Sequence, residues 1–157
     1  MEVKYINPFL ESFTNVISTM ALIELSVGRP RIKEDEIALG DISGLIGMIS
    51  PQVKGSLSIT FEKSLALKVM HNMLGEAPTS IDDEVTDMIG EITNMVCGGA
   101  KKILGEKGYE FEMATPMVVA GKNHHISHQA NGKKIILPFT SLNGKAYVEI
   151  CFQQEEA

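Results

Sequence analysis

The chain has 157 residues, a length at which folding buries roughly 70% of the surface of the unfolded chain, so one substantial core is expected. Apolar residues make up 44% of the chain and charged residues 22%, which is close to the average for soluble globular domains and argues against wholesale disorder. The formal net charge of −6 and the lack of a basic stripe argue against a nucleic-acid surface.

The first residues, the apolar runs and the two cysteines indicate the compartment and the number of domains. The first residues, MEVKYINPFLESF, include a glutamate and a proline where a signal peptide needs an uninterrupted apolar stretch, and no apolar run is long enough to span a membrane. We therefore expect a cytoplasmic protein, with residues 1–157 forming a single domain because no linker-like stretch interrupts them. Cys97 and Cys151 lie outside any C-x-x-C motif and are expected to be reduced packing residues.

The first predicted element is a helix. Asn7 and Pro8 are typical of a helix start, and apolar residues then recur at helical spacing to about Leu22. Leu25 and Val27 alternate as they would in a strand, before Gly and Pro residues end the run.

Two strands and a short helix are predicted next. Residues 45–50 and 54–62 have the composition of strands joined by a tight turn near Pro51. The apolar spacing from Leu65 onward indicates a helix that stops at Gly75.

The second half of the chain predicts a long helix followed by strands. Ser80 precedes an acidic first turn, which favours a helix N-terminus, and the helix is expected to run from about Ile81 to Leu104. Turns containing Gly and Asn separate four strand candidates, namely 111–120, 124–129, 134–140 and 145–152. The last of these could be an edge strand or a central strand. Three helices and an antiparallel-rich sheet, unevenly mixed along the chain, predict an α+β fold.

Two pairs of segments resemble one another and hint at a degenerate internal repeat. The segment 12–16 of the first helix resembles 91–95 of the long helix, and 53–61 resembles 131–139. Two halves of one helix plus strands would explain these similarities, and chance would explain them equally well. In the first helix Ser12 stands where the long helix has Glu91.

Polar residues gather on one side of the predicted helix 81–104. At about 100° per residue, Asp87, Glu91, Asn94 and Gly98 fall within an arc of roughly 60°. The apolar residues of this helix centre on the opposite side, so the polar set should face outward. An exposed helix face with Asp and Glu is ordinarily just solvated, and Glu-x-x-Asn spacing alone is a weak functional signal.

Gly98 and Gly99 add a second signal on the same helix. Each glycine inside a helix costs roughly 1 kcal/mol relative to alanine, so the pair indicates a gain such as close approach of another backbone. We expect Gly99 to permit packing against the protein's own sheet, and Gly98 to admit a loop of a partner. Relief of crowding in the core would also explain Gly99.

The sequence around this helix resembles a known family. That family has the spacing D-x-x-x-E-x-x-N followed by a proline at the start of a strand, which here is met by Asp87, Glu91, Asn94 and Pro116. The flanking runs KGSLSITFEKSLALKVMHNMLG, GEITNMVCGGAKKIL and TPMVVAG extend the likeness from position 54 to 121. The chain thus resembles the CheC, CheX and FliY phosphatases of bacterial chemotaxis, and among them the CheX branch, because it has a single Glu-x-x-Asn.

The resemblance implies a CheC-like α/β sandwich and a homodimer joined through sheet edges. It also implies dephosphorylation of a phosphorylated CheY-like response regulator, with Asn94 and Glu91 as catalytic residues and Glu91, Asp87 and Gly98 in contact with the partner. We expect no cofactor or metal on this chain, and Mg²⁺ on the receiver domain of the partner.

The chemistry of aspartyl phosphate hydrolysis suits these side chains. The transition state is loose, so catalysis depends mostly on positioning and on electrostatics. The neutral carboxamide of Asn94 accepts a hydrogen bond from the attacking water and donates one to a phosphoryl oxygen. A carboxylate would repel the phosphoryl group, so we expect Glu91 to bind a lysine of the receiver domain, with general-base catalysis as a minor alternative.

Other functions and other sites were weighed against this hypothesis. A module that binds a receiver domain without catalysis, or a structural subunit of a motility assembly, would carry the same fold. If 124–129 is a strand, His124 and His128 share a face about 13 Å apart and His125 points away, which predicts no shared metal site. Cys97 has no histidine at helical spacing, which argues against a cysteine nucleophile.

Overall fold

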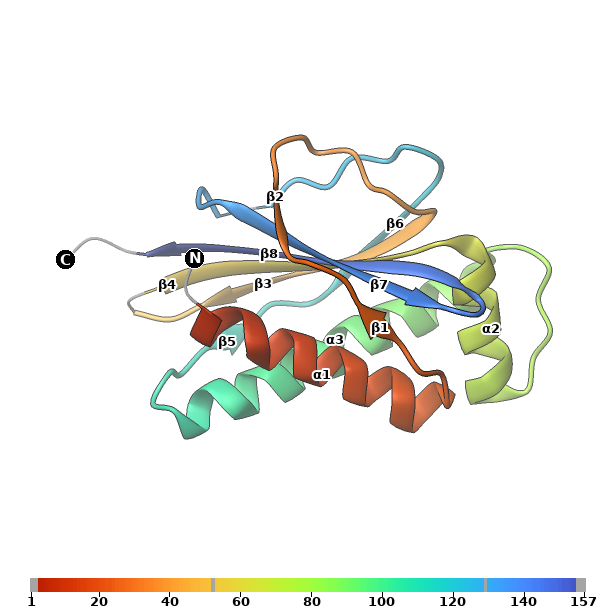
Figure 1. Ribbon diagram of the computed structural model, residues 1–157, viewed down its shortest axis with the longest axis horizontal. Coiled ribbons are helices and arrows are strands. Elements are labelled where there is room, and N and C mark those ends of the chain that lie inside the picture. The colour runs from red at the N-terminus through yellow and green to blue at the C-terminus, as the bar shows by residue number, and fades with distance from the viewer. Residues whose placement is uncertain (1–2, 52, 129, 155–157) are drawn as a thin grey trace.

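In the computed structural model, which describes residues 3–51, 53–128 and 130–154, one antiparallel sheet carries two long helices on one face (Figure 1). The strand order is β1-β7-β8-β4-β3-β5, and β2 and β6 also pair with β7 and β3, respectively. This architecture confirms the predicted class of three helices with an antiparallel-rich sheet. The strands are β1 (Ser26–Val27), β2 (Arg31–Lys33), β3 (Ile42–Ile49), β4 (Val53–Phe61), β5 (Glu112–Met113), β6 (Met117–Ala120), β7 (Lys134–Ser141) and β8 (Gly144–Gln154).

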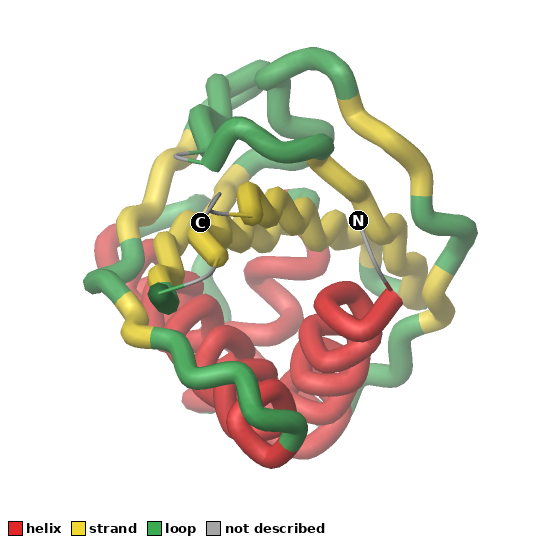
Figure 2. Tube along the Cα trace, turned by 90° about the vertical axis from the view of Figure 1, so that its left-hand side faces the viewer, coloured by secondary structure: helices red, strands yellow, loops and turns green. Residues whose placement is uncertain are grey.

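The helices occupy one side of the sheet and irregular segments occupy the other. Helices α1 (Val3–Ala21) and α3 (Asp83–Glu106) lie side by side under the sheet, and α2 (Lys63–Leu74) packs against both of them and against β8. Figure 2 shows loops over the opposite face, which we call the loop layer and define as residues 34–41, 121–128 and 130–133. No helix within the described ranges is long and apolar enough to cross a membrane.

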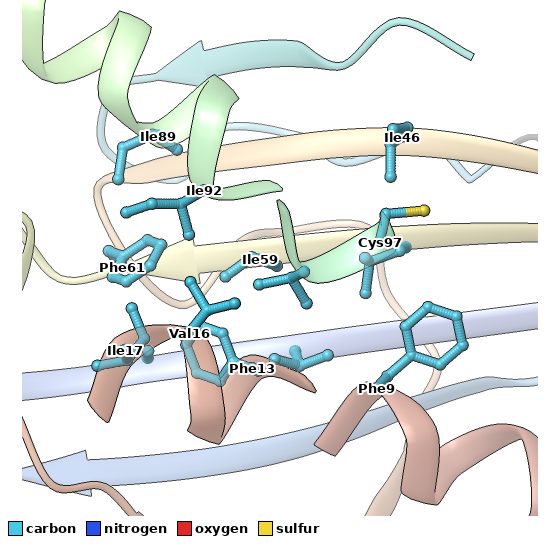
Figure 3. Close-up of a cluster of buried hydrophobic side chains, with 14 of the residues drawn as sticks. Phe9, Phe13, Val16, Ile17, Ile46, Ile59, Phe61, Ile89, Ile92 and Cys97 are labelled. Carbon is cyan, nitrogen blue, oxygen red and sulfur yellow. The ribbon is translucent and has the colours of Figure 1, made fainter. Parts of the chain in front are cut away.

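The apolar core fills the space between the helices and the sheet. Side chains on a strand alternate between faces, so every second residue of β3, β4, β7 and β8 points toward the helices. The ring of Phe13 lies at the centre, with ring centroids 5.9 Å from Phe61 and 4.9 Å from Phe139. In Figure 3, core side chains of α1, α3 and the strands point toward one another across this space.

The first helix begins earlier than the sequence indicated. It starts at Val3, so the prediction of Asn7 as a cap was wrong, and Pro8 lies inside the helix. Packing explains the extension, because Ile6 is buried and the ring of Tyr5 stacks on Phe152 with centroids 4.8 Å apart. These contacts outweigh the cost of the backbone hydrogen bond that is lost because Pro8 has no amide hydrogen.

Two predicted strands differ from the structure. The run 111–120 is broken into β5 and β6, which pair with different parts of β3 and leave 114–116 between them. The segment 124–128 belongs to the loop layer, where His125 forms an isolated bridge with Ile37, and Gln129 lies outside the described residues. Two backbone hydrogen bonds to residues 36–38 and the side-chain hydrogen bonds of its histidines hold this segment in place. Strand β2 was not predicted.

The other elements follow the sequence closely. Helix α2 ends at Leu74, and Gly75 takes a left-handed conformation with φ 73°, which confirms the predicted stop. Helix α3 begins two residues later than expected, because the carboxylate of Asp82 accepts a hydrogen bond from the Val85 amide and caps the helix. Strand β8 lies between β7 and β4, which settles the 145–152 run as a central strand.

The topology has two similar halves. Each contains a long helix, two short strands and a hairpin, and the short strands of each half pair with the outer hairpin strand of the other. The helix similarity relates one segment of α1 to one segment of α3. The strand similarity does not, because 53–61 is the inner strand β4 and 131–139 is mostly the outer strand β7. Ser12 is buried and its hydroxyl donates to the Val96 carbonyl at 2.7 Å, so this position cannot replace the exposed Glu91.

Gly44 of β3 sets how closely α3 approaches the sheet. A Cβ atom at this position would overlap the hydroxyl of Thr93 and lie 2.9 Å from the Thr93 Cβ. Thr93 is fully buried and its hydroxyl donates to the Ile89 carbonyl at 2.7 Å, so it has little room to move. Glycine is therefore required here for the helix to sit where it does.

We expect Gly44→Ala to lower the free energy of unfolding by about 1–3 kcal/mol, because it overpacks a tight contact. Chemical denaturation of Gly44→Ala, Thr93→Ala and the double variant measures the coupling between the two sites. In the double variant, Thr93→Ala removes the hydroxyl that the new methyl group at position 44 would overlap. Part of the stability lost in Gly44→Ala should therefore be recovered. Strictly additive effects would contradict this steric explanation.

Candidate functional site

The polar face of α3 is exposed, as the helical spacing indicated. Asp87, Glu91 and Asn94 all point to solvent, whereas Ile92 and Val96 of the same helix are fully buried. The three exposed side chains line an open depression of about 570 Å³ between α3 and the strand β6. The site residues predicted from the sequence are thus brought together, except for Gly98.

Strand β6 forms the other wall of this depression. Pro116, which immediately precedes β6, and Val118 both line it. Gly90 of α3 faces Val118, and a Cβ atom there would stand 3.4 Å from a methyl carbon of Val118, which is an ordinary van der Waals distance. Pro116 has no amide hydrogen to contribute to a strand ladder and lies at the break between β5 and β6.

Among the described residues, the carboxylate and carboxamide side chains of the depression are free, whereas the hydroxyl of Thr86 donates to the Asp82 carbonyl at 3.0 Å. Within the described parts of the chain, the carboxylates of Asp87 and Glu91 and the carboxamide of Asn94 have no hydrogen bond or ion pair. Glu91 and Asn94 are three residues apart on a helix, which puts their Cβ atoms about 5–6 Å apart. Two free polar groups of different chemistry therefore face the same space.

The two glycines predicted as close-approach positions have different surroundings. Gly98 does not line the depression, and nothing lies within 4 Å of the place where its Cβ would be. Gly99 does allow close packing, but its neighbour is Ser12 of α1 and not the sheet as predicted. The close approach of α3 to the sheet occurs at Gly44, in the sheet itself.

Three residues of the depression were not identified from the sequence. Thr86, Gly90 and Val118 line it together with the predicted residues. Gly90 carried a usable signal, since it is a further glycine within the helix and immediately precedes Glu91. Val118 carried none, because only the tertiary structure places β6 beside α3.

The histidines at positions 124, 125 and 128 lie in the loop layer, away from this site, and have different surroundings. His124 is buried, with Nδ1 2.7 Å from the Gly121 carbonyl and Nε2 2.6 Å from the Ser43 hydroxyl. A neutral ring that donates from Nδ1 and accepts at Nε2 satisfies both contacts. His125 is exposed. Within the described ranges, no group of three or more His, Cys, Asp and Glu residues is placed to hold a metal ion.

His128 belongs to a buried charge network on the sheet face opposite the helices. Its Nδ1 lies 2.8 Å from the Ser56 hydroxyl and its Nε2 3.4 Å from Glu149 Oε1, while Lys33 Nζ donates to Glu149 Oε2 at 2.8 Å. The side chains of Lys33 and Glu149 are only 6% and 1% exposed. Burial acts to raise the pKa of Glu149, but hydrogen bonds from His128 and Lys33 outweigh it and hold this pKa below its ordinary value. The network ties the loop layer to the sheet.

Neither cysteine has the properties of a nucleophile. Both are free and buried, and Cys97 lies on the core side of α3. Burial raises the pKa of Cys97 to about 12, so its thiol stays protonated near neutral pH. Burial raises the pKa of Cys151 as well. The expectation that both cysteines pack in the interior is confirmed.

Comparisons with known proteins agree on one family. The model of the family described as "Chemotaxis phosphatase CheX" matches residues 42–140. The curated CheY-P phosphatase CheX of Thermotoga maritima is 29% identical over 127 residues, which cover 78% of this chain and 79% of that protein.

Solved structures show the same fold over nearly the whole chain. A CheC-like superfamily protein from Shewanella sp. PV-4 is 63% identical, with a TM-score of 0.92 over 98% of this chain and 99% of that one. The structure of a CheX-CheY-BeF3-Mg²⁺ complex from Borrelia burgdorferi matches with 28% identity and a TM-score of 0.81, covering 97% of this chain and 99% of that chain. The CheC-like sandwich predicted from the sequence is thereby confirmed.

Proposed function

The chain belongs to the family of the chemotaxis phosphatase CheX, and on this premise we propose that it accelerates hydrolysis of the aspartyl phosphate on a CheY-like receiver domain. The observation that carries the proposal is the pair Glu91 and Asn94, which are exposed and have no partner among the described residues. Both line an open depression whose opposite wall includes Pro116. The solved complex of a CheX with CheY, BeF3 and Mg²⁺ supports a receiver domain as the partner.

Asn94 is the catalytic residue of the proposed mechanism. Its carboxamide oxygen accepts a hydrogen bond from a water molecule in line with the phosphorus, and its NH₂ group donates to a phosphoryl oxygen. The water oxygen forms a bond to phosphorus as the bond to the aspartyl oxygen breaks, and the products are inorganic phosphate, the aspartate carboxylate and a released proton. A neutral amide holds the water without placing negative charge against the phosphoryl group.

Glu91 anchors the receiver domain in the proposed complex. It lies one turn before Asn94 and is exposed, so a cationic side chain of the partner could reach it when Asn94 enters the partner's site. The charge-assisted hydrogen bond would set the register in which Asn94 meets the phosphoryl group. The divalent cation, expected to be Mg²⁺, would be held by the receiver domain, and Asp87 would add negative charge at the edge of the contact.

The anchoring role of Glu91 can be tested by a substitution that removes its charge. We expect Glu91→Gln to weaken binding of a receiver domain loaded with BeF3⁻ and Mg²⁺ by about tenfold or more, because an interface charge pair loses one partner. Titration calorimetry at two salt concentrations measures the loss, which should shrink at high salt. Glu106→Gln, at the exposed C-terminal end of the same helix, is the matched control. An affinity unchanged by Glu91→Gln would refute the anchoring role.

We also propose that the protein forms a homodimer through an edge of its sheet. Strand β8 is central and cannot serve, so the available edges are those formed by β1 and β2 beside β7 and by β5 and β6 beside β3. This proposal comes from the family resemblance and is independent of the phosphatase mechanism.

Two other functions make different predictions in a single assay. A module that only binds the receiver domain would do so without accelerating loss of phosphate, and a structural subunit would show neither effect. Following aspartyl phosphate on the host's receiver domains, with and without this protein, distinguishes all three. The presence of both Glu91 and Asn94 on the exposed face of α3 favours the phosphatase.

A further inference from the structure

A second hollow lies on the other side of Glu91, between α3 and the C-terminal end of α2. We call it the α2–α3 groove; it measures about 600 Å³ and shares Asp87 and Glu91 with the depression described above. The two helices pack against each other at this end of the sheet (Figure 1). A partner that covers Glu91 therefore also covers one wall of the groove.

The floor of the groove is apolar and part of it is open to solvent. Met73 and Met88 line it and pack against the protein's own core. Leu74, the last residue of α2, is 59% exposed and has no cover in the described chain. Methionine side chains are flexible and adapt to the shape of an inserted group. The floor can thus receive an apolar side chain from outside.

The rim of the groove is acidic. Glu76 and Glu84 join Asp87 and Glu91, and no Lys or Arg residue is among those that line the hollow. The C-terminal carbonyls of α2, which end at the groove, add partial negative charge, whereas the N-terminus of α3 offsets part of the charge of Glu84. An occupant of this groove must therefore bring positive charge as well as an apolar group.

We propose that the α2–α3 groove is the second half of the docking surface for the phosphorylated receiver domain, and that it takes an apolar side chain of that domain flanked by a basic residue. The inference rests on the proposed function, which brings a receiver domain to Glu91. Continuity through Asp87 and Glu91 favours this occupant over a second copy of the chain, which has a net charge of −6. The groove would then select among receiver domains of the same host, since only those with a matching apolar and basic pair fill it.

The test uses two exposed positions whose replacement leaves the core intact, Leu74→Ser and Glu76→Lys. Each of the host's CheY-like receiver domains, loaded with BeF3⁻ and Mg²⁺, is titrated with the full-length protein and its variants. We expect each variant to raise the Kd for the preferred domain about tenfold. The ratio of Kd values between the other domains and the preferred one should become smaller. In phosphatase assays of the same variants, the weaker binding should appear as a higher KM. Leu142→Ser, in the turn between β7 and β8, and Glu34→Lys, in the loop layer, are matched controls with no expected effect.

Each outcome decides the inference. An affinity unchanged in both groove variants, while Asn94→Ala is inactive, overturns the groove and leaves the proposed function intact. Weakened binding in the groove variants, with no phosphate loss above the receiver domain's own rate in the wild type, supports the groove and overturns catalysis. Unchanged receiver affinity with altered sedimentation of Leu74→Ser overturns the proposal in favour of an interface between copies.

Discussion

Replacing Asn94 by alanine is expected to reduce the acceleration of aspartyl phosphate hydrolysis by at least about 10²–10³-fold, the loss typical when a preorganised donor to a transition state is removed. Asn94 is exposed and without a partner in the described chain, so its loss should leave the fold intact. Alanine is a better helix former than asparagine, which favours α3 slightly. Single-turnover decay of a phosphorylated receiver domain measures the rate, and titration with the BeF3⁻-loaded domain measures binding, which should change little.

The chain contains its own control for this variant. Asn15 of α1 occupies the position that corresponds to Asn94 in the helix similarity, and it is also exposed, with its carboxamide oxygen 3.4 Å from the Thr19 hydroxyl. Asn15→Ala should therefore keep full activity. Asn94→Asp is a sharper probe, because it keeps an acceptor for the water but loses the NH₂ donor and adds a charge. Wild-type activity in Asn94→Ala would sink the mechanism.

Replacing Lys33 by methionine is expected to cost about 3–5 kcal/mol of unfolding free energy near pH 7, because it leaves the buried carboxylate of Glu149 without its lysine. The wild-type pKa of Glu149 is lowered in the folded protein, so its contribution to stability is complete above the unfolded pKa and is lost as the pH falls through the folded pKa. In the variant, burial disfavours the charged form. The stability difference between the two proteins should therefore narrow in acid, as urea denaturation between pH 4 and 8 would measure.

The double variant Lys33→Met with Glu149→Gln separates charge from packing. A neutral amide in place of the carboxylate removes the unpaired charge, so the double variant should be more stable than Lys33→Met alone. His128 still lies beside position 149 and provides a hydrogen-bonding group for the amide. A Lys33→Met protein as stable as the wild type at pH 7 would show that the network contributes nothing to the fold.

The candidate site was largely predictable because it lies on one helix. The face of α3 that carries Asp87, Glu91 and Asn94 follows from the helical repeat, and Asp82 through Glu84 mark the start of the helix within two residues. Family resemblance then distinguished this face from an ordinary solvated one. Neither source of information identified Val118 or the α2–α3 groove, since both depend on how separate elements pack.

The interior polar groups show the limit of reasoning from local pattern. His124 and His128 were expected on a strand, and the structure buries both in the loop layer against Ser43, Ser56 and Glu149. The Lys33 to Glu149 pair joins residues 116 positions apart in the chain, and nothing near either residue indicates the other. Such contacts exist only because the sheet brings residues together that are far apart in the chain.

The sequence alone thus determined the features that arise from neighbouring residues: the apolar face of each helix, the start of α3 to within two residues and the stop of α2 at Gly75, although Asp82 and not Ser80 caps α3. Tertiary structure decided where α1 begins, because stacking of Tyr5 on Phe152 extends the helix beyond Pro8. It also decided what stands opposite Glu91 and Asn94, because β6 packs beside α3 at Val118 and Gly44 lets α3 approach the sheet. Local preferences act over a few residues, whereas the walls of this site are set by close packing between segments far apart in the chain.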